Sequence, residues 1–471
     1  MFAFDHLARM RCVAAAILAA ICAHASARAP DQAERLNMEL VGLHDLQGRS
    51  AYQPVVHEQG GRWIAYIGLH GGNQINALTG ESEPSGTAIL DVTDPKQPKL
   101  LAHIPGSPGG GAQMVRVCKG SELPRADKSK VYLLRPYGNS AQEVWDVANP
   151  AKPRLVVKVA TGLQGTHKNW WECDSGIAYL VSGVPGWRTS RMTQIFDLGN
   201  PAKPVFIRDF GLPGHQPGAI GPVPTELHGP ISTGPKGNRV YFGYGTSSYG
   251  ILQIVDREKL LRGPKEPTAE NLLNPQVGRL DLGPDAGAHT AFPLLGMDLP
   301  VSAKDSPSGS RDFVVLTSES LADECREPRQ MAWMIDVSAE ARPLAVANWI
   351  ASEASGNFCG RGGRFGTHSS NESFASIFYK RIMFFAHFNA GVRAVDIRDP
   401  THPQEVGYYI PAANANTDKR CAGSGERCKG VIQTNNVDVD ARGYVYIVDR
   451  AHTGMHILRL TGTARAIAAP Q

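Results

Sequence analysis

Four histidines recur at a nearly constant interval along the chain. They are His167, His228, His289 and His368, separated by 61, 61 and 79 residues. Three of them end a Gly-x-His motif, and His228 follows Glu226-Leu227 at the corresponding place. Neutral imidazole is a common ligand of iron, copper and zinc. If a repeated fold brings these four side chains together, we expect them to bind a metal ion.

Three further histidines share a different position, directly after an apolar run. They are His70, His387 and His452. If the ends of those runs face the same side of the fold as the first four histidines, seven imidazoles surround one opening. We therefore predict His70, His387 and His452 as catalytic residues facing a small-molecule substrate. Nearby carboxylates are candidate acceptors for the spare N–H groups of the ligands: Glu172, Glu226 and Glu372.

The elements that must position these histidines belong to a repeat. Apolar runs with the composition of β-strands end in an aspartate, as in Ala88-Ile89-Leu90-Asp91, at six places: Asp91, Asp146, Asp197, Asp256, Asp336 and Asp396. Four of them have a proline four residues later, which marks a turn. Two strands precede each aspartate and another usually follows, so each unit holds four strands. This is the content of a propeller blade.

A seventh, degenerate copy occupies residues 437–460 and lacks its fourth strand. The N-terminal segment Met38–Leu43 is similar to the fourth strands elsewhere and can complete this last blade. We therefore predict an all-β fold, a single seven-bladed β-propeller over residues 37–460, followed by a C-terminal tail over 461–471. A β-sandwich array or several small β domains is the alternative. In a propeller, the entry to each innermost strand and the loop after each second strand lie at the same end, which would bring both histidine groups together.

The repeat resembles the LVIVD-repeat family of exported bacterial and archaeal proteins. This resemblance implies the propeller architecture and is nearly silent about function. Surface-protein associations of that family imply a non-catalytic alternative, a propeller that binds a protein or glycan on its rim. Histidine-caged propellers, such as the iron-binding carotenoid-cleavage oxygenases, are similar in layout only. In WD-repeat blades a Gly-His pair at a similar entry is structural.

The N-terminus and the cysteines predict export. Arg9 and Arg11 precede a short apolar run, and a small-residue cleavage site follows, so residues 1–27 are predicted as a signal peptide. Six cysteines then remain, and an even number in an oxidising compartment predicts disulfides, with 15 possible connectivities. The repeat alignment suggests these pairs: Cys118–Cys173, Cys325–Cys359 and Cys421–Cys428. We expect secretion across the inner membrane, to the periplasm.

Composition narrows the remaining functions. The 471 residues carry a net charge of +4, so neither nucleic acid nor an anionic membrane is expected as a partner. No segment after the signal peptide is long and apolar enough to span a membrane, and the sequence holds no oligomer signal. The run Gly360–Gly366 is rich in glycine and arginine and is either an anion-binding loop or a solvated one.

All-nitrogen ligation favours copper, iron or zinc over calcium and magnesium. The function predicted from the sequence is an exported metal-dependent enzyme, an oxidoreductase or oxygenase with copper or iron on the propeller axis. A lyase or hydrolase with the ion as Lewis acid remains open.

Overall fold

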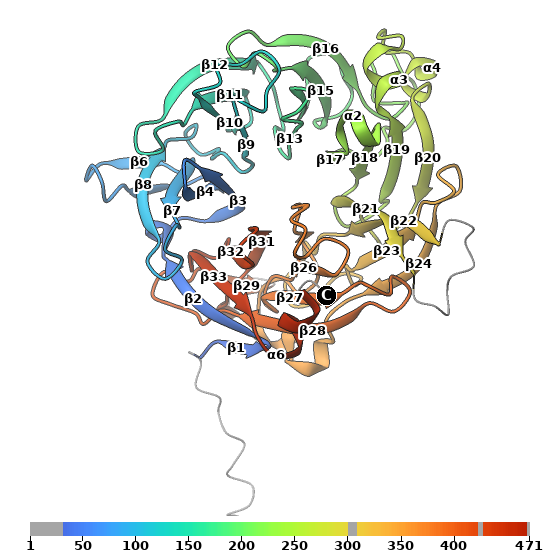
Figure 1. Ribbon diagram of the computed structural model, residues 1–471. Coiled ribbons are helices and arrows are strands. Elements are labelled where there is room, and N and C mark those ends of the chain that lie inside the picture. The colour runs from blue at the N-terminus through green and yellow to red at the C-terminus, as the bar shows by residue number, and fades with distance from the viewer. Residues whose placement is uncertain (1–31, 300–308, 423–426, 469–471) are drawn as a thin grey trace, which may run out of the picture. The chain divides into compact units, whose positions relative to one another are not determined.

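The computed structural model describes residues 32–299, 309–422 and 427–468 (Figure 1). The chain divides into two units, and nearly all described residues belong to the second, Ala33–Gln471. The predicted signal peptide, residues 1–27, lies outside the described residues.

Seven four- or five-stranded antiparallel sheets of the second unit are arranged in a ring, which confirms the predicted seven-bladed β-propeller (Figure 1). The first strand of each blade lies nearest the centre and the last lies outermost. Blades one to four comprise β3 (Ala51–Gln59), β4 (Arg62–Leu69), β7 (Thr87–Asp91) and β8 (Lys99–Ile104); β9 (Arg116–Lys119), β10 (Val131–Tyr137), β11 (Ala141–Asp146) and β12 (Arg154–Thr161); β13 (Trp170–Trp171), β14 (Ile177–Ser182), β15 (Met192–Asp197) and β16 (Val205–Phe210); and β17 (Leu227–Ser232), β18 (Arg239–Tyr244), β19 (Ile251–Asp256) and β20 (Gln276–Asp281).

The remaining blades include both ends of the described chain. They comprise β21 (Thr290–Asp298), β22 (Ser310–Thr317), β23 (Ala332–Asp336) and β24 (Leu344–Trp349); β25 (Ser369–Ser370), β26 (Ile382–Ala386), β27 (Val392–Asp396) and β28 (Gln404–Ile410), extended by β1 (Glu34–Leu36); and β31 (Thr434–Val439), β32 (Tyr444–Asp449) and β33 (Met455–Leu460), completed by β2 (Met38–His44). Short elements in the loops are the hairpins β5 (Asn73–Ile75) with β6 (Ser82–Pro84) and β29 (Lys419–Ala422) with β30 (Arg427–Gly430), and the helices η1 (Leu46–Gly48), α2 (Gly234–Gly237), α3 (Arg257–Arg262), α4 (Ala269–Leu273), η3 (Glu353–Ser355), α5 (Phe358–Arg361) and α6 (Gly462–Ala468).

Ring closure occurs as the sequence predicts. Strand β2 pairs antiparallel with β33, with Met38 opposite Leu460, so the two ends of the propeller share the last blade. This pairing gives the last blade its four strands and closes the ring. The boundaries differ from the prediction at both ends. Strand β1 adds a fifth strand to blade six, and residues 462–468 of the predicted tail form helix α6, which buries Ala464 and Ala468 in the core between blades six and seven.

The repeated aspartate has a local structural role. Its carboxylate accepts the backbone N–H two residues later, as Asp146 does from Ala148 at 3.0 Å and Asp197 from Gly199 at 2.8 Å. This Asx turn ends the third strand of a blade and directs the chain into the fourth. In blade four Asp256 instead caps helix α3 by accepting Lys259 N–H, and the insertion that contains α3 and α4 follows.

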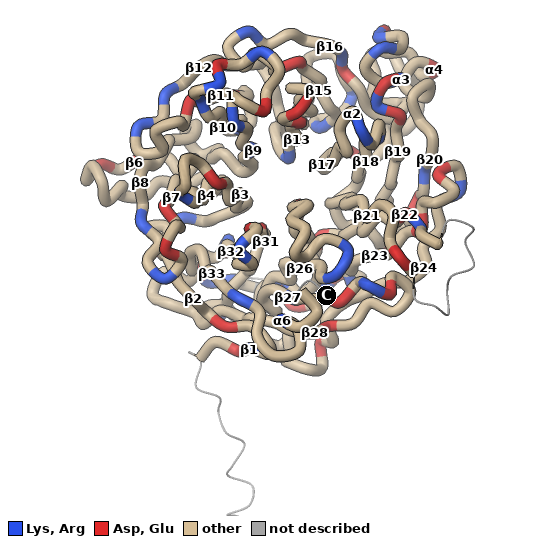
Figure 2. Tube along the Cα trace, viewed as in Figure 1, with Lys and Arg blue, Asp and Glu red and all other residues tan. Residues whose placement is uncertain are grey.

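The apolar core lies between neighbouring blades. One cluster combines Tyr179 and Val181 of blade three with Val240 and Phe242 of blade four, and similar clusters join other blade pairs. Blade-to-blade packing therefore holds each innermost strand at a fixed place around the axis. Charged residues of both signs are interspersed around the described part of the ring (Figure 2).

All three predicted disulfides form. Cys118–Cys173 joins blades two and three, Cys325–Cys359 joins two loops at blades five and six, and Cys421–Cys428 closes the β29–β30 hairpin. Within the described residues, no helix has the length and apolar character needed to cross a bilayer.

Candidate metal centre

The four histidines of the first group lie at the entrances of four successive innermost strands. His167 precedes β13, His228 is the second residue of β17, and His289 and His368 immediately precede β21 and β25. All four side chains are buried, with exposed fractions of 5%, 2%, 0% and 1%. Equivalent positions in consecutive blades face the axis, so the predicted convergence occurs.

The glycine of the Gly-x-His motif is needed because this part of the chain packs against backbone of the preceding blade or of its own blade. A Cβ atom at Gly287 would lie 1.9 Å from Thr246 O, and one at Gly165 would lie 2.4 Å from Ser190 O. Gly165 also has a φ of +60°, which favours glycine. The motif therefore fixes the entry of the strand, and the histidine two residues later is aimed by that entry.

The middle residue of the motif anchors the same turn. Thr367 Oγ1 donates to Ser318 O of the previous blade at 2.8 Å, and Thr166 Oγ1 donates to Gly138 O in the same way. These bonds satisfy the hydroxyl groups within the blade framework. The threonine hydroxyl groups, and not the imidazoles of His167 and His368, therefore anchor the turn to the preceding blade. In WD-repeat blades the histidine itself has such a structural role.

The four imidazoles contact one another in sequence around the axis. His167 Nε2 and His228 Nε2 are 3.0 Å apart, and the ring centres of His228 and His289 are 3.6 Å apart. The ring centres of His289 and His368 are separated by 4.5 Å. Two nitrogen ligands at right angles, each about 2.1 Å from one ion, lie about 3.0 Å apart. The separation of His167 and His228 matches that geometry.

Two of the rings have a hydrogen-bond partner on their outer nitrogen, and for His368 that partner sets which nitrogen carries the proton. His368 Nδ1 lies within hydrogen-bonding distance of Asn435 O, and a carbonyl oxygen only accepts, so Nδ1 carries the proton and Nε2 keeps its lone pair. His289 Nδ1 is 2.8 Å from Thr290 Oγ1, whose oxygen also accepts from Lys168 Nζ at 2.6 Å. The Nε2 atoms of His289 and His368 are buried and have no hydrogen-bond partner among the described residues. A buried, unpartnered nitrogen is costly, and a metal ion would satisfy it.

The cluster also contains a carboxylate, Glu319, that was not predicted from the sequence. Glu319 lies in the loop after β22, and its carboxylate oxygens are 3.9 Å, 3.8 Å and 3.7 Å from the Nε2 atoms of His228, His289 and His368. His167, His228 and His289 form one group that could hold a metal ion, and His289, Glu319 and His368 form a second. Glu319 stands outside every motif of the repeat, so only its loop position after a second strand, shared with His70, could have pointed to it.

Burial keeps the four imidazoles neutral. Loss of hydration holds the pKa of His167, His228, His289 and His368 well below the usual range, and neighbouring cations lower it further. Desolvation raises the pKa of Glu319, which Arg450 and Arg364 partly oppose. Neutral imidazole is the metal-binding form, so the site is prepared for a cation without first releasing protons.

The second histidine group does not gather as a unit. His70 lies at the cluster, where its ring contacts Tyr52, and Tyr52 Oη in turn is 3.1 Å from His167 Nε2. His387 is buried against Trp349 and Phe365, which lowers its pKa to about 3 through desolvation. His452 Nδ1 lies 2.8 Å from Gly48 O. Among the described contacts, neither His387 nor His452 touches the four imidazoles.

The carboxylates predicted as acceptors have other partners. Glu172 pairs with Arg257, Glu226 accepts from Ser190, and Glu372 pairs with Lys168 and Arg116. The outer nitrogens of His368 and His289 instead meet Asn435 O and Thr290 Oγ1, and those of His167 and His228 have no partner among the described residues.

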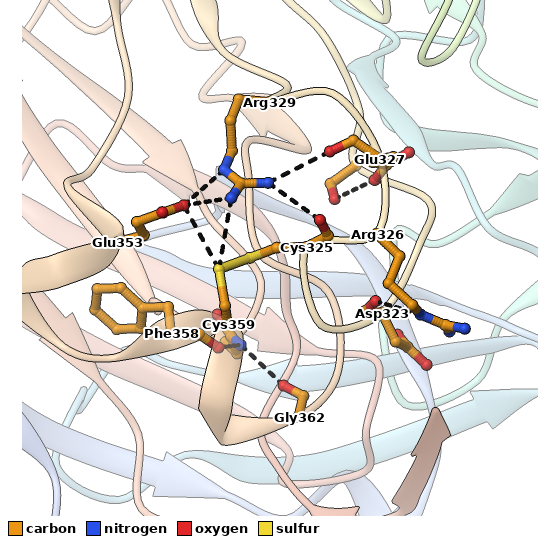
Figure 3. The surroundings of a disulfide bond; sticks show 11 residues. Asp323, Cys325, Arg326, Glu327, Arg329, Glu353, Phe358, Cys359 and Gly362 are labelled. Atoms are coloured by element: carbon orange, nitrogen blue, oxygen red, sulfur yellow. Dashed lines mark hydrogen bonds and ion pairs between the residues drawn. A yellow bond between two sulfur atoms is a disulfide. The ribbon is translucent and has the colours of Figure 1, made fainter. Parts of the chain in front are cut away.

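The Cys325–Cys359 disulfide ties together the two loops that frame the site (Figure 3). The first loop follows β22 and carries Glu319, and the second precedes β25 and carries Arg364 and His368. Arg329 reinforces the connection, because it donates to Cys325 O at 3.2 Å and to Glu353 Oε2 at 2.6 Å (Figure 3). The covalent link therefore restrains Glu319 relative to the histidine loop.

No protein-family model matches this chain, and no curated protein matches it in sequence. The predicted membership of the LVIVD-repeat family stays a prediction. Fold and site together define the class as a seven-bladed β-propeller with histidine and glutamate groups at its axis that could bind a metal ion.

Proposed function

We propose that this protein is an exported metal-dependent oxidoreductase with one copper or iron ion at the propeller axis. His167, His228, His289 and His368 are the proposed ligands, with Glu319 as a further ligand or as their acidic neighbour. Disulfides and the predicted signal peptide support an oxidising compartment, the periplasm, as the location.

The observation that carries the proposal is the pair of unpartnered nitrogens. His289 Nε2 and His368 Nε2 are buried beside Glu319, and none of the described residues offers either atom a hydrogen bond. Apart from the contact between His167 Nε2 and His228 Nε2, the four neutral imidazoles give up hydration without replacing it by bonds among themselves in the part of the chain that the structure describes. A metal ion that accepts their lone pairs supplies the missing stabilisation.

The donor set favours a redox-active ion. Imidazole suits copper, iron and zinc, and two histidines with one carboxylate form the set typical of non-haem iron(II) enzymes. His289, Glu319 and His368 reproduce that composition. Such an ion supplies one-electron chemistry or the activation of dioxygen.

Tyr52 and His70 are the polar groups best placed to act on a substrate. Tyr52 Oη lies beside His167, and burial raises the pKa of its hydroxyl well above the usual range. Ser50 Oγ donates to Arg450 O and so accepts from His70 Nδ1, which leaves His70 Nε2 as an acceptor that meets Arg450 Nη2 at 3.5 Å. We propose that His70 orients the substrate. His387 and His452, as placed here, act at most through other residues.

Elemental analysis of the mature protein tests the proposal. Tag-free protein expressed into the periplasm should hold about one copper or iron ion per chain, and a His228→Ala/His289→Ala variant should hold none. His215→Ala is the matched control, because His215 is equally buried but bonds Pro224 O in a loop at blades three and four. The proposed site would be refuted if the protein stays metal-free after incubation with both ions, or if the double variant retains metal. Either result would favour the alternative function, a propeller that binds a protein or glycan on its rim.

A further inference from the structure

Two arginines cover the candidate metal centre on the side of the histidine loops. Arg364 Nη1 donates to Glu319 Oε1 at 3.0 Å, and Arg450 Nη1 lies 3.8 Å from the same oxygen. Both guanidinium groups also lie over the ring of Phe388, at 5.4 and 6.0 Å. The Phe388 ring centre is 5.2 Å from that of His368. One carboxylate oxygen thus serves two cations directly beside the cluster.

A second pair of cations near the cluster also shares one ion-pair partner. Lys168 and Arg116 both pair with the carboxylate of Glu372, and Arg116 also interacts with Asp438. Together with Arg364 and Arg450 these are four cations whose ion pairs are with two carboxylates, in side chains of which at most 18% is exposed. The neighbouring Arg191 and Arg420 each have an acidic partner, Glu226 and Asp418, at 3.8 Å.

This excess charge is unfavourable without a counter-ion. Two guanidinium groups near one carboxylate repel each other, and charges removed from water are poorly screened. Burial lowers the pKa of Arg450 to about 10, and the charge of Arg364 contributes to that shift. A bound metal cation would add further positive charge to the same space.

Solvent reaches the site from the side of these arginines. The side chains of Arg364 and Arg450 are each 18% exposed, whereas those of His228, His289 and His368 are 3%, 0% and 1% exposed. Arg364 donates through Nη1 to Glu319 and to Ser320 O, and no bond of its Nε or Nη2 is found among the described residues. A planar guanidinium edge of this kind matches the two oxygens of a carboxylate or phosphate.

We infer that the axial site accepts a small organic anion, whose carboxylate or phosphate group is held by Arg364 and Arg450 beside the four histidines. The inference rests on the proposed function for what happens to this anion, but the anion-binding step depends on the arginines alone. An anion site of this kind means that the expected small-molecule substrate carries an acidic group. Arg364 belongs to the glycine-rich run 360–366, so an anion site there uses the side chain of this arginine.

Calorimetric titration with formate, benzoate and inorganic phosphate tests the inference, with benzamide as the neutral counterpart of benzoate. We expect at least one of the three anions to bind. If benzoate binds, benzamide should bind at least tenfold more weakly. Arg364→Gln and Arg450→Gln should each weaken anion binding at least tenfold. Arg398→Gln is the control, since Arg398 pairs with Asp396 on the outside of blade six and should leave binding unchanged.

The same titrations on the His228→Ala/His289→Ala variant separate this inference from the proposed function. Arginine-dependent anion binding that persists without metal supports the anion site even if the metal proposal fails. Anion binding that is unaffected by both arginine substitutions, or equal affinity for benzoate and benzamide, would overturn it. If one arginine variant fails to fold, as judged by circular dichroism, the other still decides, because the two residues come from different blades.

Discussion

Replacing Glu319 by glutamine removes one negative charge from the centre with almost no change in shape. In metal-free protein the change weakens the bond from Arg364 and leaves two guanidinium groups without their shared carboxylate. Because the glutamine amide oxygen still accepts a hydrogen bond and the arginines are partly exposed, we expect a loss of about 1–2 kcal/mol in the free energy of unfolding.

The metal-loaded protein should lose more. The Glu319 oxygens lie 3.7–3.9 Å from three Nε2 atoms, so the carboxylate either binds the ion or directly neighbours its ligands. Loss of such a neighbour typically reduces metal affinity by about 10–100-fold. This corresponds to about 1.4–2.8 kcal/mol of lost stabilisation by metal, in addition to the loss seen without it.

Urea unfolding of wild type and Glu319→Gln, each with and without the metal, measures both contributions in one cycle. Glu143→Gln is the matched control, because Glu143 forms a similarly buried pair with Arg135 at 3.0 Å in blade two. Glu143→Gln should destabilise the protein equally with and without metal. If Glu319→Gln gains as much stability from the metal as wild type does, Glu319 has no part in metal binding and the argument from its position fails.

Three further predictions follow from the structure. Cys118→Ser/Cys173→Ser should cost about 4 kcal/mol and Cys421→Ser/Cys428→Ser about 2 kcal/mol in denaturant unfolding, because the closed loops span 55 and 7 residues; equal losses would contradict the loop-closure argument. His387→Phe should retain the metal while His368→Phe loses it, by elemental analysis, since His387 already packs among aromatic rings; metal loss in both variants would place His387 at the centre after all. Burial depresses the pKa values of the axial histidines in the folded state, so below about pH 6.5 the unfolded chain binds more protons than the folded protein. On acidification below that pH, the free energy of unfolding of the metal-free protein should fall by about 1.4 kcal/mol per pH unit for each such histidine. Urea unfolding between pH 7.5 and 5.5 measures this loss. Constant stability over that range would mean that these rings are not held neutral.

The repeat made the fold predictable because each blade is a local unit. Four strands, an Asx turn at Asp146 or Asp197 and a short connection recur within one period, so a single sequence shows the unit several times. Closure by Met38–His44 was readable for the same reason, since the missing fourth strand of the last blade had a counterpart at the other end. The additional strand β1 and helix α6 belong to no repeat and were therefore not foreseen.

The convergence of His167, His228, His289 and His368 follows from the repeat, because residues at the same place in successive blades face the axis. Which other groups join them depends on how the loops pack. Glu319, Arg364 and Arg450 come from loops whose lengths vary between blades, and His387 and His452 leave their strands in directions set by local packing, with His452 at a φ of +73°. The repeat predicts the strands because they pair through the backbone in every blade. The loops are positioned by side-chain packing, ion pairs and the Cys325–Cys359 disulfide, and these interactions do not recur from blade to blade.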